Sequence, residues 1–242
     1  MNTLSSTDDP AAFDWLASLL QTTDSAYPIG GFSHSGGLEG MVGLEWIGSF
    51  EGLRRFMHQE VAETLANVEL PLMHMAWEAA IHDDGALLTM LDDTSEAARF
   101  SAEQRLASRR LGMQRWTLLE KLHARRASEE WQNRLSILGQ HLPYKHLCVV
   151  GGVEAQLLNT PISAAMVALC HQTVTMVGQA AMKIMRIGQT SVQSLITEMA
   201  LRYPHLVVHA KSLELDEVGT SLPVLDIATA WHETANARMF LS

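Results

Sequence analysis

Hydrophobic positions along this chain recur mostly every three or four residues, which is the spacing of one buried face on an α-helix. Residues 50–67 are a clear instance, with Leu53, Phe56, Met57, Val61 and Leu65 on one stripe. The same spacing predicts further helices over residues 13–23, 72–82, 96–126, 128–138, 147–158, 162–185, 191–203 and 225–240, with short ones near Ser35 and before Leu91.

Turn-forming residues separate these helices. Pro71 predicts a break or a new helix start, because proline suits the first helical turn. The Asp, Thr and Ser residues at 92–95 predict an N-terminal cap for the helix that follows. Gly151 and Gly152 lie together in a helical segment and indicate close packing of two helices. Residues 206–209 are a weak strand candidate, and no other run alternates in the way that a strand requires.

We therefore predict an all-α fold, a single-domain bundle of roughly eight to eleven helices over residues 13–242. The apolar helix at 162–185 is expected at its centre, buried on nearly all sides. Residues 1–12 are rich in Ser, Thr and Asp and are expected to form a flexible leader.

Composition narrows the function. The 242 residues are 47% hydrophobic and 18% charged, which is typical of a globular protein. A net charge of −10 argues against nucleic-acid binding, which needs a basic face. The basic residues between Arg105 and Arg126 alternate with glutamates and are expected on a solvated helix face. Cys148 and Cys170 are expected to be buried free thiols. The polar N-terminus and the lack of an apolar run of ~18 residues predict a cytoplasmic protein without a membrane segment.

Residues 24–39 form a loop with four glycines and a proline, unusual in a chain dominated by helix formers. A phosphate-binding P-loop would need Lys and Ser or Thr where Gly37 and Leu38 stand. A dinucleotide loop would need a different glycine spacing after a strand. A nucleophile elbow would need glycine at Ser35 and a preceding strand, so a hydrolase using Ser33 or Ser35 is disfavoured.

Other polar residues give weak signals. His141, His146 and Cys148 are close in sequence and could hold nickel or zinc, so a nickel-carrying protein is the alternative function. No strong ligand motif supports it, and we predict no metal site, cofactor or catalytic residue. Lys183 and Arg186 end the apolar helix, where the helix dipole stabilises cations; contact with an acidic partner is the other interpretation.

Four segments together carry a family resemblance. Residues 28–39, P-I-G-G-F-S-H-S-G-G-L-E, resemble the signature loop of the UreF family of urease accessory proteins. Residues 101–108 resemble its S-x-E-x-R-x-x-S segment, and residues 180–190 resemble its A-A-x-R-L-x-x-L-G-Q-T segment. His232-Glu233 and the final R-M-F-L-S resemble its H-E…R-L-F-x-S ending. Lys183 stands where the family usually has arginine, and lysine cannot form a bidentate fork.

The resemblance implies an all-helical homodimer without enzymatic activity or a cofactor. It implies binding to UreD, also called UreH, and recruitment of the GTPase UreG to apo-urease for GTP-dependent nickel insertion. The glycine loop would dock a partner or shape the dimer, and a positive φ at Gly31 would make that residue hard to replace. The C-terminal residues would be an exposed partner anchor, as arginine and aromatic residues often are. The partner-binding residues expected on this basis are Tyr27, Pro28, Gly30, Gly31, Phe32, Ser35, Glu39, Lys183, Arg186, Arg238, Phe240 and Ser242.

Overall fold

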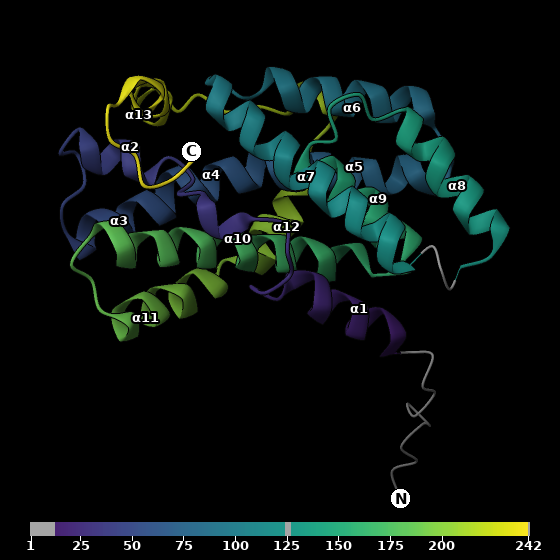
Figure 1. Cartoon of the computed structure of the whole chain (residues 1–242), viewed down its shortest axis with the longest axis horizontal. Helices are drawn as coiled ribbons and strands as arrows, with labels where there is room; N and C mark the ends of the chain where they lie inside the picture. Colours follow the sequence, from purple (N-terminus) through teal and green to yellow (C-terminus); the bar gives the residue numbers. More distant parts are fainter. Residues whose placement is uncertain (1–12, 124–126, 242) are drawn as a thin grey trace, which may run out of the picture.

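A computed structural model describes residues 13–123 and 127–241 of the protein. Every regular element in these residues is a helix (Figure 1). The all-α prediction is confirmed, whereas the predicted leader at residues 1–12 lies outside the described residues. The helices are α1 Asp14–Thr23, α2 Leu38–Gly43, α3 Phe50–Phe56, α4 Ala62–Thr64, α5 Leu70–Ile81, α6 Gly85–Ala97, α7 Ala102–His123, α8 Glu129–Gln140, α9 Leu147–Leu157, α10 Ile162–Ile184, α11 Gln189–Ala200, α12 Tyr203–Ala210 and α13 Pro223–Thr234.

The segments α3, α4 and α5 form one uninterrupted helix. Two π-helical turns, Met57–Val61 and Leu65–Glu69, join them without a break in helical hydrogen bonding. Pro71 therefore starts no separate helix, contrary to the prediction. A π turn widens the helix locally, and the second one ends at Glu69, two residues before Pro71, where the missing N–H has to be accommodated.

The predicted cap at residues 92–95 is wrong, because α6 runs through these residues. Asp92 is fully buried, and it caps the segment before α9, which is distant in sequence. Its carboxylate accepts the backbone N–H groups of Tyr144, Lys145 and His146 at 2.7, 2.9 and 2.9 Å. Asp92 therefore fixes the chain that enters α9, whose first residue follows His146. A carboxylate that accepts several backbone N–H groups is a strong local anchor.

The glycine pair in α9 does allow close helix packing, as predicted. A Cβ on Gly152 would lie 2.3 Å from the carbonyl oxygen of Met73 in α5. A Cβ on Gly151 would meet nothing closer than the end of the Met73 side chain, at 3.4 Å. Backbone contact between α5 and α9 therefore depends on the second glycine alone.

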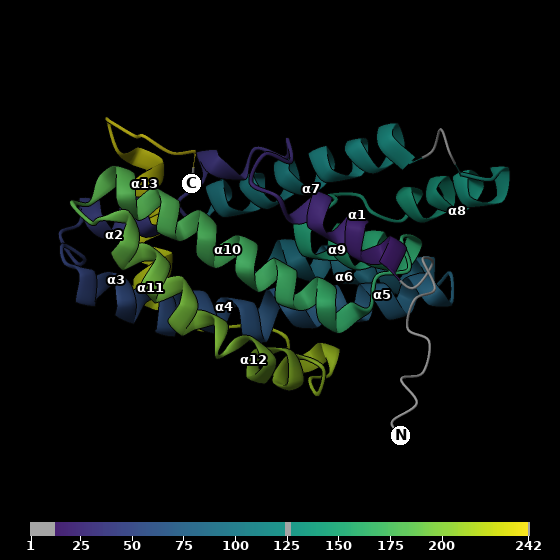
Figure 2. The same cartoon turned by 90° about the horizontal axis from the view of Figure 1, so that it is seen from below.

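Helix α10 runs through the middle of the molecule and packs against α1, α2, α5, α9, α11 and α12 (Figure 2). Its central position confirms the prediction in part, because residues such as Met166 and Val174 are fully buried. Its other side is open to solvent at Val167 and Lys183, so the helix is not buried all round. Within the described part of the chain, no helix combines the length and apolarity needed to cross a membrane.

The chain after α11 departs from the prediction twice. Residues 206–209, the weak strand candidate, belong to α12, which buries Tyr203, Leu206, Val207 and Ala210 at helical spacing. The last helix ends at Thr234 rather than near residue 240. The residues after it leave the helix and turn back toward the start of α2 (Figure 1).

Candidate functional site

The four segments that carry the family resemblance meet at one place. They are the glycine loop (residues 24–39) with the start of α2, the first turn of α7, the last turn of α10, and the tail (residues 235–241) that follows α13. Side chains from all four are in contact, although the residues involved lie up to 201 positions apart in sequence. We treat this junction as the candidate functional site.

Glu39, in the first turn of α2, is the centre of the junction. One carboxylate oxygen, Oε1, accepts the N–H of Met239 at 2.7 Å. The other, Oε2, accepts the N–H of Phe240 at 2.8 Å and lies 3.0 Å from Nε2 of His232. The backbone N–H of Glu39 donates to Oγ of Ser35 at 3.2 Å. Glu39, expected to face a partner, therefore binds the chain's own C-terminal residues.

His232 links Glu39 to a second carboxylate. This buried histidine places Nδ1 2.6 Å from Oε2 of Glu103, in the first turn of α7. Both ring nitrogens face carboxylate oxygens, and both can donate if the ring is a doubly protonated imidazolium. Arg238 of the tail makes an ion pair with Oε1 of Glu103. The His232 ring thus lies between two carboxylates, and Arg238 adds a cation beside Glu103.

Capping interactions hold the α7 side of the junction. Ser101 and Gln104 form a reciprocal pair at the start of α7: the N–H of Gln104 donates to the Ser101 hydroxyl at 3.1 Å, and the N–H of Ser101 donates to the Gln104 side chain at 3.3 Å. Such a capping box satisfies two otherwise unpaired donors at a helix start. It fixes the first turn, and therefore the position of Glu103.

The tail is not the fully exposed anchor that the sequence suggested. Phe240 is buried, with 5% of its surface exposed, and Nζ of Lys183 lies 5.2 Å from the centre of its ring. This distance is within the range of a cation–π interaction. Arg238 is tied to Glu103. The prediction of exposure is therefore wrong for Phe240, because the folded chain supplies its own site for the ring.

Exposed apolar side chains do remain beside the buried ring. Met239 and Leu241 are 61% and 52% exposed, and Phe32 in the glycine loop is 67% exposed. The N–H of Leu241 donates to the carbonyl oxygen of Ser33 at 2.8 Å, which joins the tail to the loop. The glycine loop and the tail thus bring three large exposed apolar side chains to one region.

The glycine loop uses its glycines in two ways. Gly30, Gly36 and Gly37 have positive φ values of 90°, 65° and 88°, which side chains other than glycine rarely adopt. Gly31 is not among the positive-φ residues, and a Cβ there would meet nothing within 4 Å. The proposed need for a positive φ at Gly31 is therefore wrong; its neighbour Gly30 carries that conformation.

The second use is close approach to α13. A Cβ on Gly40 would lie 2.3 Å from the carbonyl oxygen of Ala228, and one on Gly37 would lie 2.5 Å from Cδ1 of Leu225. These glycines allow α2 to lie directly against α13. The contact brings Glu39 of α2 within hydrogen-bonding distance of His232 on α13.

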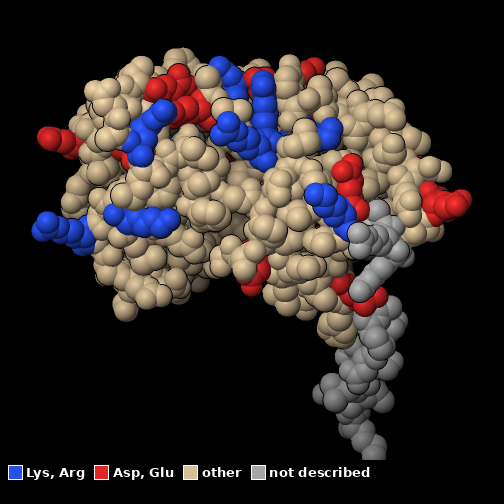
Figure 3. Space-filling view, in the orientation of Figure 1, with Lys and Arg blue, Asp and Glu red and all other residues tan. Residues whose placement is uncertain are grey.

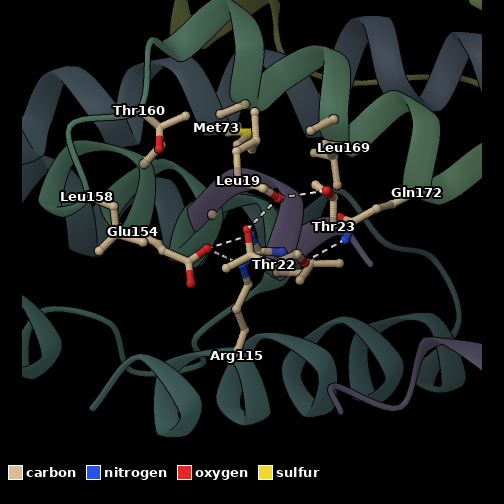
Figure 4. A pocket seen from close by; sticks show the side chains of 15 residues that line it. Leu19, Thr22, Thr23, Met73, Arg115, Glu154, Leu158, Thr160, Leu169 and Gln172 are labelled. Carbon is tan, nitrogen blue, oxygen red and sulfur yellow. Dashed lines mark hydrogen bonds and ion pairs between the residues drawn. The ribbon is translucent and has the colours of Figure 1, made fainter. Parts of the chain in front are cut away.

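A buried polar cluster lies beneath the glycine loop. Arg115 reaches from α7 to form an ion pair with Glu154 of α9, beside Thr22 of α1 and a cavity of about 20 Å³ (Figure 4). Tyr27 is also buried, and burial together with the nearby Glu154 charge raises its pKa to about 12. Tyr27 is thus a core residue and not part of a docking surface. Arg115 likewise departs from the predicted solvated face.

The serines of the loop serve its structure. The hydroxyl of Ser33 donates to the carbonyl oxygen of Gly30 at 2.7 Å. Ser35 is fully buried, and its hydroxyl oxygen accepts the N–H of Glu39. Burial, with a smaller contribution from Arg110, lowers the pKa of His34. A buried Ser35 cannot attack a substrate from solvent, so the geometry does not support the hydrolase hypothesis.

The sequence cluster of His141, His146 and Cys148 does not form a metal site. Nε2 of His146 lies 2.9 Å from Glu96, and Cys148 is buried beside Ser95. Burial raises the pKa of Cys148 to about 12, whereas a metal ligand must be a thiolate. In the described ranges, no three or more His, Cys, Asp or Glu side chains form a group suited to a metal ion. Both cysteines are buried and free, as predicted.

The remaining predicted site residues lie around the junction or apart from it. Pro28 and Gly30 line an open cleft with Arg110, Tyr144 and Leu241. Arg186 is exposed beyond the end of α10, and Ser242 lies outside the described residues. Acidic and basic side chains gather next to one another over the α7 and α13 region (Figure 3). The rest of that face carries fewer charges.

His232 and Glu103 were not predicted as site residues. Both lie in segments quoted for the resemblance, so their position in a motif was the available signal. Their roles depend on contact between residues 129 positions apart, which the sequence pattern does not reveal.

Comparison with known proteins agrees with this convergence of segments. The sequence model of the UreF family matches residues 47–200. The chain is 28% identical over 232 residues to the urease accessory protein UreF of Pseudomonas entomophila, covering 94% of this chain and 97% of that protein. It is 29% identical over 224 residues to the UreF of a Nostoc strain, covering 93% and 94%. The chain therefore belongs to the UreF family of urease accessory proteins.

Proposed function

We propose that this protein is a non-enzymatic scaffold of urease maturation. Together with UreD (UreH) it recruits the GTPase UreG to apo-urease and modulates GTP-dependent nickel insertion, in the cytoplasm and as a homodimer. The observation that supports this best is the junction itself. Four motif segments converge on a network of structural hydrogen bonds and ion pairs that leaves apolar side chains exposed.

The composition of the junction fits protein recognition. The outward side chains of Phe32, Met239 and Leu241 are large and apolar, while the charged groups beside them are paired internally. Exposed apolar groups that gather at one place often mark interaction sites. The glycine loop and the tail act in this proposal as one contact surface, with Pro28 and Gly30 at its edge.

Light scattering after gel filtration tests the proposal. The protein alone should elute as a dimer, and addition of UreD and UreG should give one complex that contains all three. The protein alone should hydrolyse no GTP, and UreG should show altered GTP turnover within the complex. If the protein binds neither UreD nor UreG, the scaffold function is refuted.

The tail gives a more local test. Deletion of residues 239–242 should weaken binding to UreD while helix content, measured by circular dichroism, stays unchanged. The helical fold should persist because the deleted residues follow the last helix, which ends at Thr234. Undiminished UreD affinity of the truncated protein would remove the tail from the partner surface.

A further inference from the structure

The carboxylate of Glu39 binds two backbone N–H groups of the tail, which the scaffold proposal does not itself explain. We propose that Glu39 is the positioning residue of the partner surface: its carboxylate fixes the tail on the glycine loop, so that Met239 and Leu241 lie outward beside Phe32. This inference rests on the proposed function, because it assigns a cause to the shape of that contact surface. Glu39 acts through the tail and has no contact with the partner of its own.

The tail depends on Glu39 because it has left the helix. Helix α13 ends at Thr234, so the N–H groups of Met239 and Phe240 have no helical carbonyl to bind. Both donate to the Glu39 carboxylate, at 2.7 and 2.8 Å. Successive backbone N–H groups that converge on one anion form a recognised binding geometry, and bonds to a charged acceptor are stronger than neutral ones.

The same two bonds decide which side chain is buried. With Met239 and Phe240 donating to Glu39, the Phe240 ring is 5% exposed, whereas Met239 and Leu241 on either side are 61% and 52% exposed. A shift of the tail by one residue would bring a different side chain to the site of the buried ring. Glu39 thus sets the register of the tail and, through it, the pattern of outward side chains.

Neighbouring groups hold the Glu39 carboxylate in place. His232, itself only 2% exposed, lies between Glu39 and Glu103, and Ser35 binds the Glu39 backbone N–H. Arg238 connects the tail to Glu103. His232 and Ser35 therefore restrain Glu39 from outside the tail, which favours one bound conformation over many.

Hydrogen exchange in the protein alone tests the positioning role directly. In Glu39→Gln, one carboxylate oxygen is replaced by an NH₂ group, which cannot accept a bond. Whichever of the Met239 and Phe240 amides loses its acceptor should exchange at least about tenfold faster than in the parent, the fold-change expected for a lost charge-assisted bond. Glu63→Gln, at an exposed glutamate of α4, is the matched control and should leave both amides unchanged. Unaltered exchange in Glu39→Gln would overturn the inference.

A second variant tests the same bond from the tail and leaves α2 intact. Met239→Pro removes the N–H that donates to Oε1, because proline has none. It should accelerate exchange at Phe240, whereas Met239→Ala should not. Protection of amides in α10 should stay constant in both variants, which would show that the fold is preserved. Equal exchange at Phe240 in the proline and alanine variants would contradict the proposed clamp.

UreD affinity then separates positioning from direct contact. Glu39→Gln should weaken binding at least about tenfold, and combining it with deletion of residues 239–242 should cost nothing beyond the deletion. If the deletion alone leaves affinity unchanged, the tail contact of the proposed function is wrong. If the deletion weakens binding but Glu39→Gln does not, the positioning role is wrong and the proposed function stands. Losses that multiply would also refute it, because Glu39 would then act independently of the tail.

Discussion

Replacing Gly40 by alanine should loosen the contact between α2 and α13. The added Cβ would lie 2.3 Å from the carbonyl oxygen of Ala228 and 2.9 Å from its carbon. The two helices would have to separate by about 1 Å before these atoms reached van der Waals distance. Overpacking of this kind costs about 1–3 kcal/mol, and the higher helix propensity of alanine offsets about 1 kcal/mol of it. The net loss in the free energy of unfolding should therefore be at most about 2 kcal/mol.

For a chain of this size, that loss corresponds to a fall in melting temperature of at most about 8 °C. Thermal unfolding followed by circular dichroism, together with urea denaturation, measures both quantities. Gly48→Ala is the control, since Gly48 is exposed, has nothing within 4 Å of an added Cβ and lies outside the helices. It should change stability little or raise it by about 0.4–1 kcal/mol. Equal melting temperatures for Gly40→Ala and Gly48→Ala would refute the close-approach argument.

Two further predictions concern the interior. Burial, helped by the charge of Arg99, lowers the pKa of His146 to about 3, so below its ordinary value of about 6.5 the unfolded chain takes up a proton that the folded chain does not. The stability from this residue is present above pH 6.5 and is lost as pH falls, by about 2 kcal/mol between pH 7 and pH 5. Urea denaturation at both pH values should show a smaller change in the free energy of unfolding for His146→Gln than for the parent. An identical change in both proteins would contradict a neutral buried imidazole. In α9, Gly152→Ala should lower the melting temperature, because its Cβ would meet the Met73 backbone at 2.3 Å, whereas Gly151→Ala should not; the reverse order would show that α5 and α9 pack differently in solution.

The helices could be read from sequence because their signal is local. Hydrophobic spacing predicted α1, α8, α9, α10 and α11 to within a few residues, since each buries a continuous stripe. The errors arose where a residue type is compatible with two different structural roles. Asp92 was expected to cap the next helix, yet it caps the chain before α9. The β-branched pair Val207 and Val208 favoured a strand, but burial of Tyr203, Leu206 and Ala210 at helical spacing decided the element.

The candidate site was predicted by its segments but not by its contacts. Glu39, Lys183, Arg238 and Phe240 were all expected to bind a partner, and the structure instead brings them together with one another or with neighbouring segments. Tyr27 was expected in a docking surface as part of the glycine loop, whereas it packs inward near Glu154. A loop residue's direction depends on the elements beneath it, which the local sequence does not contain.

The sequence by itself determined the all-helical class, the approximate helix bounds and the family, because spacing and motifs are properties of neighbouring residues. The tertiary structure alone decided that Glu39 meets His232, 193 positions away, and that the tail folds back to bury Phe240. The physical reason is the close approach of α2 to α13 at Gly40. Packing in three dimensions decides where two helix backbones can touch. The contact of α2 with α13 places the residues of the candidate site next to one another.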